Sequence, residues 1–378
     1  MLDVLIAGAG PAGAMAALVL ARAGARVVMI DRERFPRDKL CGDTLNPGAV
    51  GLLASFGLTG GVLDGAVKLS GMQLTGPRAS VRAVYGKPPA ALALTRRAFD
   101  AWLIEHAVAA GARFESGVVA REPLADEHSG IPVVRGLVLD GSDHRAVRMP
   151  AILTIAADGR RSTLARGMGL AATPRGPRRW AYGTYATGVS DMSDLGEMHV
   201  RHGWYFGLAP LGHGIANVCV VKPATPAERR RPIDEVRDAI ARDPGLRARF
   251  EGAALDDEVR VLGPLASEAR AVGVAGLLLA GDAGGFVDPM TGDGVHLALQ
   301  SGVLAAREAL RALETGDIAG AVSRLERERR KAFGRKLRFN RMVRGLVSSP
   351  AAVDAASVAA RVLPSVMRRA VRYAGDVR

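Results

Sequence analysis

The segment Leu2–Asp31, LDVLIAGAGPAGAMAALVLARAGARVVMID, decides the fold of this chain. It contains an apolar run that ends at Gly8, a stretch of small apolar residues, Ala14–Ala23, and a second apolar run, Val27–Ile30. Continuous apolar runs on either side of a helix are typical of parallel strands that are buried on both faces. The segment therefore predicts a βαβ unit and an α/β fold.

The turn between the first strand and the helix matches G-x-G-x-x-G, a dinucleotide fingerprint. Gly8 permits the tight turn, Gly10 lets the backbone approach a pyrophosphate, and Gly13 allows close packing of helix on strand. The helix N-terminus offers free N–H groups to the phosphates, and Asp31 can accept a hydrogen bond from a ribose hydroxyl. The residues expected to contact the dinucleotide here are Gly8, Gly10, Pro11, Ala12, Gly13, Asp31 and Arg32.

The composition of the 378 residues is that of a globular protein, with 48% hydrophobic and 24% charged residues. The formal net charge is +13, but no nucleic-acid recognition motif accompanies the basic residues, so no nucleic-acid partner is expected. The two cysteines and seven histidines form no metal-ligand spacing, and no metal is expected. No basic leader precedes the first strand and no apolar run has membrane-spanning length, which favours a cytoplasmic location.

Two later segments add to the fingerprint. Gly281-Asp282 follows the apolar run Leu277–Ala280, and the loop PMTGDG, Pro289–Gly294, comes shortly after. With the first motif, these segments resemble the FAD-dependent oxidoreductase superfamily that contains the aromatic-ring hydroxylases (group A monooxygenases), flavin-dependent halogenases and geranylgeranyl reductases. The resemblance extends from residue 1 to about residue 310, and it implies that Asp282 binds the ribityl chain of FAD. It implies further cofactor contacts at Gly281, Pro289, Gly292, Gly294 and Val295.

The same resemblance covers two more positions. Asp158, in the motif ADGRRS, is expected to position the pyrophosphate, and Arg96, at the start of a predicted helix, is expected to contact FAD. The implied fold is a Rossmann-like FAD-binding domain of the glutathione-reductase type, with an inserted antiparallel-sheet substrate domain and C-terminal helices. Alternating patterns at residues 198–200, 204–208 and 215–221 predict strands of that inserted sheet. The predicted division is an FAD-binding domain at 1–70, 91–175 and 262–325, a substrate domain at 71–90 and 176–261, and basic helices at 326–378.

The segment FPRDKLCGD, residues 35–43, resembles the region near the flavin in geranylgeranyl reductases, and it makes Cys41 the candidate catalytic residue and a cofactor contact. The segment WYFGLAP, residues 204–210, partly matches the lipid-contact motif of those enzymes, although the usual ending is missing. Trp204, Phe206 and Pro210 are therefore predicted substrate contacts. These aromatics could instead pack the second sheet onto its neighbour, the commoner role of such a cluster.

The flavin motifs predict a redox enzyme without fixing its reaction. The continuation LGHGIANV, residues 211–218, is similar to bacterial monooxygenases of polyketide secondary metabolism. The favoured expectation is a monooxygenase in which NAD(P)H reduces FAD and a flavin C4a-hydroperoxide hydroxylates an apolar or aromatic, polyketide-like small molecule. The alternatives are reduction of isoprenoid double bonds, as in geranylgeranyl reductases, and a flavin-binding protein without turnover. A halogenase is disfavoured because the Trp-x-Trp-x-Ile-Pro signature is missing.

The segment Arg324–Arg344 is strongly basic and carries apolar residues among its charges. The favoured interpretation is a solvated pair of helices packed on the FAD-binding domain. Peripheral contact of these C-terminal helices with an anionic membrane is the alternative, and it would suit a lipid-like substrate.

Overall fold

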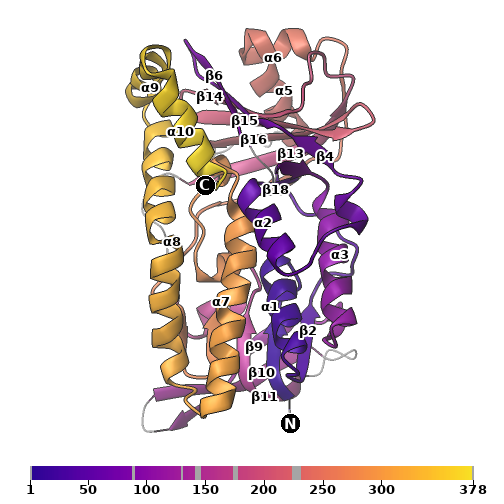
Figure 1. Cartoon of the computed structure of the whole chain (residues 1–378), viewed down its shortest axis with the longest axis vertical. Helices are drawn as coiled ribbons and strands as arrows, with labels where there is room; N and C mark the ends of the chain where they lie inside the picture. The colour runs from indigo at the N-terminus through magenta and orange to yellow at the C-terminus, as the bar shows by residue number, and fades with distance from the viewer. Residues whose placement is uncertain are drawn as a thin grey trace.

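The computed structural model describes residues 2–86, 90–128, 131–140, 146–172, 178–223 and 231–376. The predicted domain boundary between residues 175 and 176 lies outside these ranges. Within them the chain forms two large sheets, one above the other along the long axis, with helices on their outer faces (Figure 1).

The first large sheet has β1 (Leu2–Ala7) at its centre, between β2 (Val27–Asp31) and β11 (Ala146–Ala156), and all three are parallel. The outer strands of this sheet are β8 (Arg113–Ser116), β21 (Leu277–Leu279) and β20 (Gly273–Val274). Of these six strands, β20 alone runs antiparallel to its neighbour. The predicted βαβ unit is confirmed, and the strand predicted at residues 277–280 lies beside β11.

Strand β11 takes part in two kinds of pairing. Its second half belongs to the parallel sheet, whereas its first half pairs antiparallel with β10 (Ile131–Asp140), which in turn pairs with β9 (Ala120–His128). The short helix α4 (Thr163–Gly167) packs on β9. This antiparallel ribbon was not predicted.

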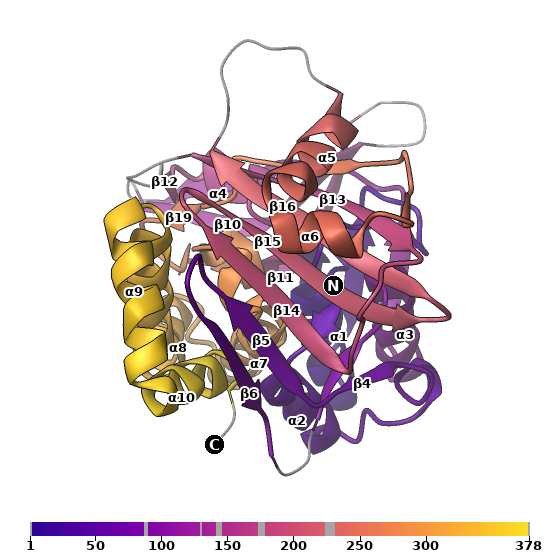
Figure 2. The ribbon, with the colours of Figure 1, turned by 90° about the horizontal axis from the view of Figure 1, so that it is seen from above.

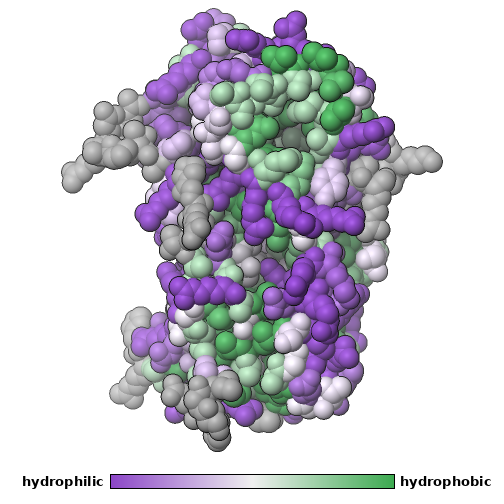
Figure 3. All heavy atoms as spheres, turned by 90° about the vertical axis from the view of Figure 1, so that its left-hand side faces the viewer, coloured by the Kyte–Doolittle hydropathy of each residue, from purple (hydrophilic) through white to green (hydrophobic). Residues whose placement is uncertain are grey.

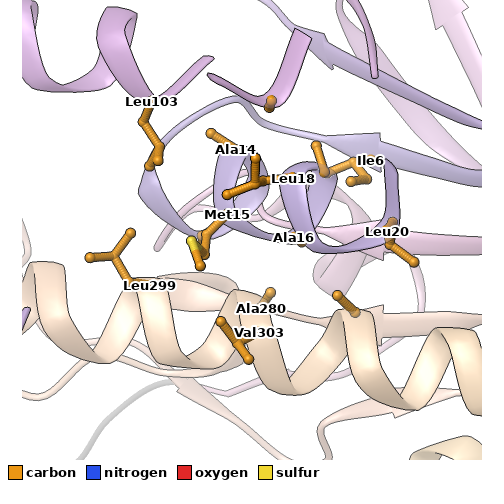
Figure 4. Packing of buried hydrophobic residues seen from close by; sticks show 14 of the residues in the cluster. Ile6, Ala14, Met15, Ala16, Leu18, Leu20, Leu103, Ala280, Leu299 and Val303 are labelled. Carbon is orange, nitrogen blue, oxygen red and sulfur yellow. The ribbon is translucent and has the colours of Figure 1, made fainter. Parts of the chain in front are cut away.

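Helix α1 (Pro11–Arg22) lies between the parallel sheet and α7 (Gly294–Thr315), with α3 (Arg96–Ala109) beside it. Figure 4 shows Met15 and Leu18 of α1 pointing toward neighbouring helices, with Leu299 and Val303 of α7 close to Met15. A Cβ added to Gly302 of α7 would lie 2.2 Å from the Ala12 carbonyl oxygen, so α1 and α7 touch through their backbones. The start of α1 therefore lies directly against the middle of α7.

The second large sheet contains the three predicted strands, now β14 (Leu195–Arg201), β15 (Trp204–Gly212) and β16 (Ile215–Pro223), in antiparallel order. Its other members are β13 (Arg179–Thr187), β17 (Ala254–Leu255), β18 (Arg260–Leu262), β5 (Gly71–Thr75) and β6 (Ser80–Val84). Strand β5 joins β14 in parallel, so the sheet is mixed and not purely antiparallel as expected. Helices α5 (Pro232–Arg242) and α6 (Pro244–Arg249) cover its outer face (Figure 2).

Smaller elements connect the two sheets. A three-stranded sheet is formed by β3 (Thr44–Leu45), β4 (Val67–Leu69) and β7 (Ala91–Ala93). A two-stranded sheet is formed by β12 (Ala171–Ala172) and β19 (Glu268–Ala269). Helix α2 (Pro47–Ser55) packs on α7, and Asn46 caps it by accepting a hydrogen bond from the Ala49 N–H at 2.9 Å.

The C-terminal part is helical, as predicted. Helix α8 (Gly320–Val347) runs along α7, and α9 (Pro350–Val362) and α10 (Pro364–Ala374) then fold over the β5–β6 edge of the second sheet (Figures 1 and 2). The predicted boundary at residues 325 and 326 falls inside α8, and the domain division stays a prediction. Among the described residues, no helix combines the length and the apolar character needed to cross a bilayer.

Candidate active site

A central cavity of about 1190 Å³ lies between the two large sheets and the C-terminal helices. It exceeds the roughly 300–1,000 Å³ of ordinary ligand pockets. Most of the predicted cofactor residues line this cavity, although they come from distant parts of the sequence. They are Gly8, Gly10, Pro11, Ala12, Asp31, Arg32, Cys41, Arg96, Asp158, Gly281, Asp282, Pro289, Gly292, Gly294 and Val295. The fold therefore brings the separate motifs to one place.

The glycine turn has the shape that the fingerprint requires. Gly8 has a φ of +99°, and a Cβ there would lie 2.3 Å from the Ala157 carbonyl oxygen. A Cβ on Gly13 would lie 1.8 Å from the Gly8 oxygen, so this glycine serves helix packing and lies behind the cavity wall. Gly10 differs, because the nearest atom to its added Cβ is Arg37 Nη2 at 3.6 Å. The space over Gly10 is open to a ligand.

Asp31 ends β2 at the cavity wall. Its Oδ2 accepts a hydrogen bond from the Ala9 N–H at 2.7 Å, and its Oδ1 accepts one from the Glu33 N–H at 2.9 Å. A carboxylate has about four acceptor positions, so Asp31 can still accept a ribose hydroxyl. Arg32 next to it is mostly exposed, with its Nε 3.3 Å from Glu33 Oε1.

Arg37 is a site residue that sequence reasoning missed. Its guanidinium lies 4.7 Å from the centre of the Phe35 ring and 3.1 Å from the Asp100 carboxylate. Its Nη1 is buried and has no hydrogen-bond partner among the described residues. A free buried donor beside the open space at Gly10 fits a phosphate oxygen. The position of Arg37, directly after Phe35-Pro36 in the quoted segment, was the signal that could have found it.

Asp158 shows the complementary pattern. Its Oδ2 accepts the Thr163 N–H at 2.8 Å, whereas its buried Oδ1 has no partner among the described residues. Burial raises the pKa of this carboxyl. An unpaired acceptor on one side and the unpaired Arg37 donor on the other match a ligand that carries both hydroxyls and phosphates. The residues present therefore fit a dinucleotide such as FAD.

The loop after β21 brings an acid among bases. Burial raises the pKa of Asp282, while Lys39, Arg96 and Arg160 act electrostatically to lower it. All four residues line the cavity, so this wall has a net positive charge that suits an anionic cofactor. Lys39 and Arg160 were not predicted, because only the folded chain places them opposite Asp282.

Helix α8 braces the same loop from behind. Arg329 donates from Nη2 to the Gly284 carbonyl at 3.0 Å and from Nη1 to the Ser301 hydroxyl at 2.7 Å. Ser301 also accepts the Gly281 N–H at 2.9 Å. Farther along α8, Asn340 donates to Asp293 at 2.8 Å, one residue before α7 begins. The flavin-side loop is thus held in position by a helix far away in sequence.

Both cysteines of the chain, Cys41 and Cys219, border the cavity as free thiols. Burial raises the pKa of Cys41, and burial raises that of Cys219 to about 12. Both thiols are therefore protonated at neutral pH, which suits a proton donor or an apolar wall better than a nucleophile. The catalytic role predicted for Cys41 remains a proposal.

A buried carboxyl cluster lies directly behind Cys41. Asp43 Oδ2 accepts hydrogen bonds from the Tyr185 hydroxyl at 3.0 Å and from Asn217 Nδ2 at 2.9 Å, and Oδ1 accepts the Arg96 N–H at 3.1 Å. Asn217 also donates to the Cys41 carbonyl at 3.0 Å. Burial raises the pKa of Asp43 to about 6. The cluster links the Cys41 segment to the second sheet. These partners were not predicted, because they come from distant segments.

The structure corrects the predicted substrate contacts. Phe206 is fully buried on the outer face of the second sheet, 5.8 Å from Phe250 between ring centres, and Trp204 packs in the same cluster. Side chains alternate along a strand, so the even-numbered residues Trp204, Phe206 and Pro210 face away from the cavity. None of the three is among the described residues that line it. Tyr205 faces inward instead, and its hydroxyl donates to Asp288 at 2.6 Å.

The far end of the cavity, which we call the apolar arm, is walled by three helices. Each helix contributes four residues at the spacing i, i+3, i+4, i+7, which places them on one face. These residues are Phe339, Met342, Val343 and Leu346 of α8, Val353, Ala356, Ser357 and Ala360 of α9, and Met367, Ala370, Val371 and Ala374 of α10. Leu74 and Val81, from β5 and β6, lie on the opposite wall. The arm is thus an apolar channel that joins the cofactor region.

Residues 1–339 match a protein family whose model describes an FAD binding domain. The chain belongs to this FAD-binding family. The flavoprotein is 33% identical, over 80% of its length, to a menaquinone reductase of Mycolicibacterium smegmatis, of which the alignment covers 75%. It is 30% identical to a digeranylgeranylglycerophospholipid reductase of Methanopyrus kandleri, over 89% of its own chain and 84% of the relative. It is an FAD-dependent oxidoreductase.

Solved structures support the fold of the flavoprotein. A geranylgeranyl bacteriochlorophyll reductase-like protein from Thermoplasma acidophilum superposes with a TM-score of 0.81 at 24% identity, over 94% of this chain and 90% of that one. A flavin-dependent brominase superposes with a TM-score of 0.84 at 20% identity, over 99% and 93%. At this level of identity the superpositions show only that the fold is shared.

Proposed function

We propose that the flavoprotein reduces a carbon–carbon double bond of an isoprenoid chain, the alternative that the segment around Cys41 raised, in place of the favoured hydroxylation. The apolar arm carries this proposal. Its three helical stripes present no charged side chain to the cavity, which fits a hydrocarbon chain better than a polar ring system. The related menaquinone and digeranylgeranylglycerophospholipid reductases are named for substrates with isoprenoid chains, which supports the same choice.

The chemistry requires two electrons and two protons in balance. When bound and reduced, FAD would supply a hydride for one carbon of the double bond, while a proton goes to the other, and NAD(P)H is the proposed source of the electrons. The walls of the arm exclude water and hold the chain. The protonated thiol of Cys41, in the wall of the same cavity, is the proposed proton donor.

The test is a reaction under nitrogen. The protein is loaded with FAD, reduced with dithionite, and mixed with a polyprenyl substrate while the visible spectrum of the flavin is followed. Reoxidation of the flavin together with a product heavier by two hydrogens is expected. A product that appears only with oxygen and is heavier by one oxygen atom would instead establish the monooxygenase. Absence of any product with bound flavin would favour a non-catalytic flavin-binding protein.

A further inference from the structure

The bend between α9 and α10 exposes apolar side chains to solvent. Val362, at the end of α9, is 71% exposed, Leu363 is 53% exposed, and Val366, at the start of α10, is 54% exposed. Val358, one turn earlier in α9, is 46% exposed. We call these four residues the elbow. Large apolar side chains seldom gather on a surface without a partner, so the elbow indicates an interaction surface.

Arginines surround the elbow. Arg361, Arg368 and Arg369 are exposed, and no carboxylate among the described residues lies within ion-pair distance of them. The acids of these two helices are occupied elsewhere: Asp354 contacts His202 at 3.1 Å, and Asp376, just beyond α10, contacts Lys336 at 2.8 Å. Figure 3 shows apolar residues gathered high on this side of the molecule, with hydrophilic residues around them. An apolar centre with unpaired cations beside it is complementary to an anionic bilayer.

Three basic residues of α8 are engaged within the protein. Arg324 pairs with Glu308 and Asp317, Arg329 is half-buried and donates to the flavin loop, and Lys336 is buried against Asp376. Other basic residues of α8, among them Arg327 and Arg335, are exposed, but Met342 is the one large apolar side chain that the described part of α8 exposes beside them. The elbow, which carries both the exposed apolar side chains and unpaired arginines, is the better candidate.

The elbow also belongs to the wall of the apolar arm. Helices α9 and α10 turn one face into the arm and carry the elbow on the other side. Met342 of α8 lines the arm and is still 60% exposed, so the arm reaches the molecular surface beside these helices. Phe339, one turn below, stacks edge-to-face on Tyr373 of α10 at 5.1 Å and closes α8 against α10 there. A chain that enters at Met342 passes directly into the arm.

From these observations we propose that the elbow docks on an anionic lipid surface and brings the opening at Met342 to the acyl region, so that a membrane-resident isoprenoid enters the arm without crossing water. The entry of substrate rests on the proposed function, whereas docking itself does not. Binding combines the burial of the four apolar side chains with attraction of the three arginines, and it weakens as salt rises.

The first experiment measures binding of the flavin-loaded full chain to vesicles by co-sedimentation. Vesicles of equal parts phosphatidylcholine and phosphatidylglycerol are expected to bind it, and vesicles of phosphatidylcholine alone are expected to bind it more weakly. Val362→Asp should weaken binding about tenfold or more, since it puts a charge in place of an apolar group that docking would bury. Arg368→Gln with Arg369→Gln should weaken it roughly fivefold for each arginine.

Matched controls separate docking from general charge. Val108→Asp changes a 46% exposed valine on α3, and Arg327→Gln with Arg335→Gln removes two exposed arginines of α8. Both controls should bind like the parent. The proposal is overturned if the parent does not bind anionic vesicles, if Val362→Asp binds normally, or if the α8 pair loses as much as the elbow pair. It is also overturned if the elbow proves to be a dimer contact, with Val362→Asp turning a dimer into a monomer.

Activity then distinguishes the two proposals. With a substrate embedded in vesicles, the turnover of Val362→Asp should fall in proportion to the loss of vesicle binding. With a short water-soluble isoprenoid, the variant should turn over at the parental rate. Normal vesicle binding without turnover of either substrate overturns the proposed function and leaves docking in place. Turnover of both substrates by Val362→Asp at the parental rate overturns docking and leaves the proposed function in place.

Discussion

At the residue scale, two glycines of one turn have different constraints. A methyl group at Gly8 would overlap the Ala157 carbonyl, whereas at Gly10 it would meet only the end of the Arg37 side chain. Gly8→Ala is therefore expected to destabilise the fold itself. Gly10→Ala should leave the apoprotein as stable as the parent, within about 1 kcal/mol, because its backbone is ordinary for any residue.

The consequence appears when the cofactor binds. The methyl group of Gly10→Ala would stand where the diphosphate approaches, so FAD affinity should fall at least about tenfold. Titration of the apoprotein with FAD, alongside urea unfolding without FAD, measures both quantities. Equal FAD affinity in parent and variant would contradict the assignment of this turn to the diphosphate.

Asp43 makes stability depend on pH. Its pKa is raised from 3.8 to about 6 because burial disfavours the charged form, so the folded protein holds a proton that the unfolded chain has released. Stability therefore falls as pH rises between those two values, by roughly 3 kcal/mol in total. Asp43→Asn cannot ionise at this position, so this fall in the free energy of unfolding should be missing from the variant. Urea unfolding of both proteins across this pH range should show the parent losing stability relative to the variant. A difference that does not change with pH would contradict this account.

At the element scale, α8 positions the flavin loop through Arg329. Burial lowers the pKa of this arginine to about 10, yet it stays charged at neutral pH and donates to Gly284 and Ser301. Arg329→Met keeps the volume and removes both hydrogen bonds, so the loop should loosen and FAD affinity should drop roughly tenfold, the equivalent of one or two net hydrogen bonds. Arg327→Met, an exposed change on the same helix, is the control in the FAD titration. The same FAD affinity in both variants would show that the brace has no part in binding.

Local sequence patterns predicted the elements that depend on local rules. The βαβ unit, the helix that begins at Arg96 and the three central strands of the second sheet all follow from periodicity and from Gly and Pro signals. The ribbon β9–β10 and the parallel pairing of β5 with β14 were not predicted, because the sequence of one strand does not show which other strand it pairs with. Sequence reasoning placed the inward aromatics of β15 at Trp204 and Phe206, whereas Tyr205 faces inward. Neighbouring residues of a strand lie on opposite faces, so an error of one residue reverses the face.

The site was predictable to a similar depth. Motifs located the glycines, Asp158 and Asp282, since their chemistry is carried by short segments. The donor Arg37, the Asp43 cluster and the brace by Arg329 depend on contacts between segments far apart, and only the folded chain shows them. The apolar arm belongs to this second group, although each of its helical stripes is visible in the sequence once the partner helices are known.

At the scale of the whole molecule, the C-terminus fastens the helices that wall the arm. Asp376 accepts hydrogen bonds from Lys336 Nζ at 2.8 Å, from His296 Nδ1 at 2.8 Å and from Asn46 at 3.1 Å. Asp376→Ala should free α10 at a local cost of roughly 1–3 kcal/mol. Amide hydrogen exchange in residues 364–374 should then quicken while the central sheet stays protected. Asp354→Ala, at an exposed pair on α9, is the control, and equal exchange in both variants would contradict the role of Asp376.

The place of β21 in the first sheet has a consequence for synthesis. The edge of β11 that β21 covers has been made long before Leu277–Leu279 leave the ribosome, so the nascent chain carries an open, apolar strand edge while residues 157–276 are made. The flavin loop, its brace on α8 and the helices of the arm come later still. FAD therefore has no complete site to bind until α8 has been made.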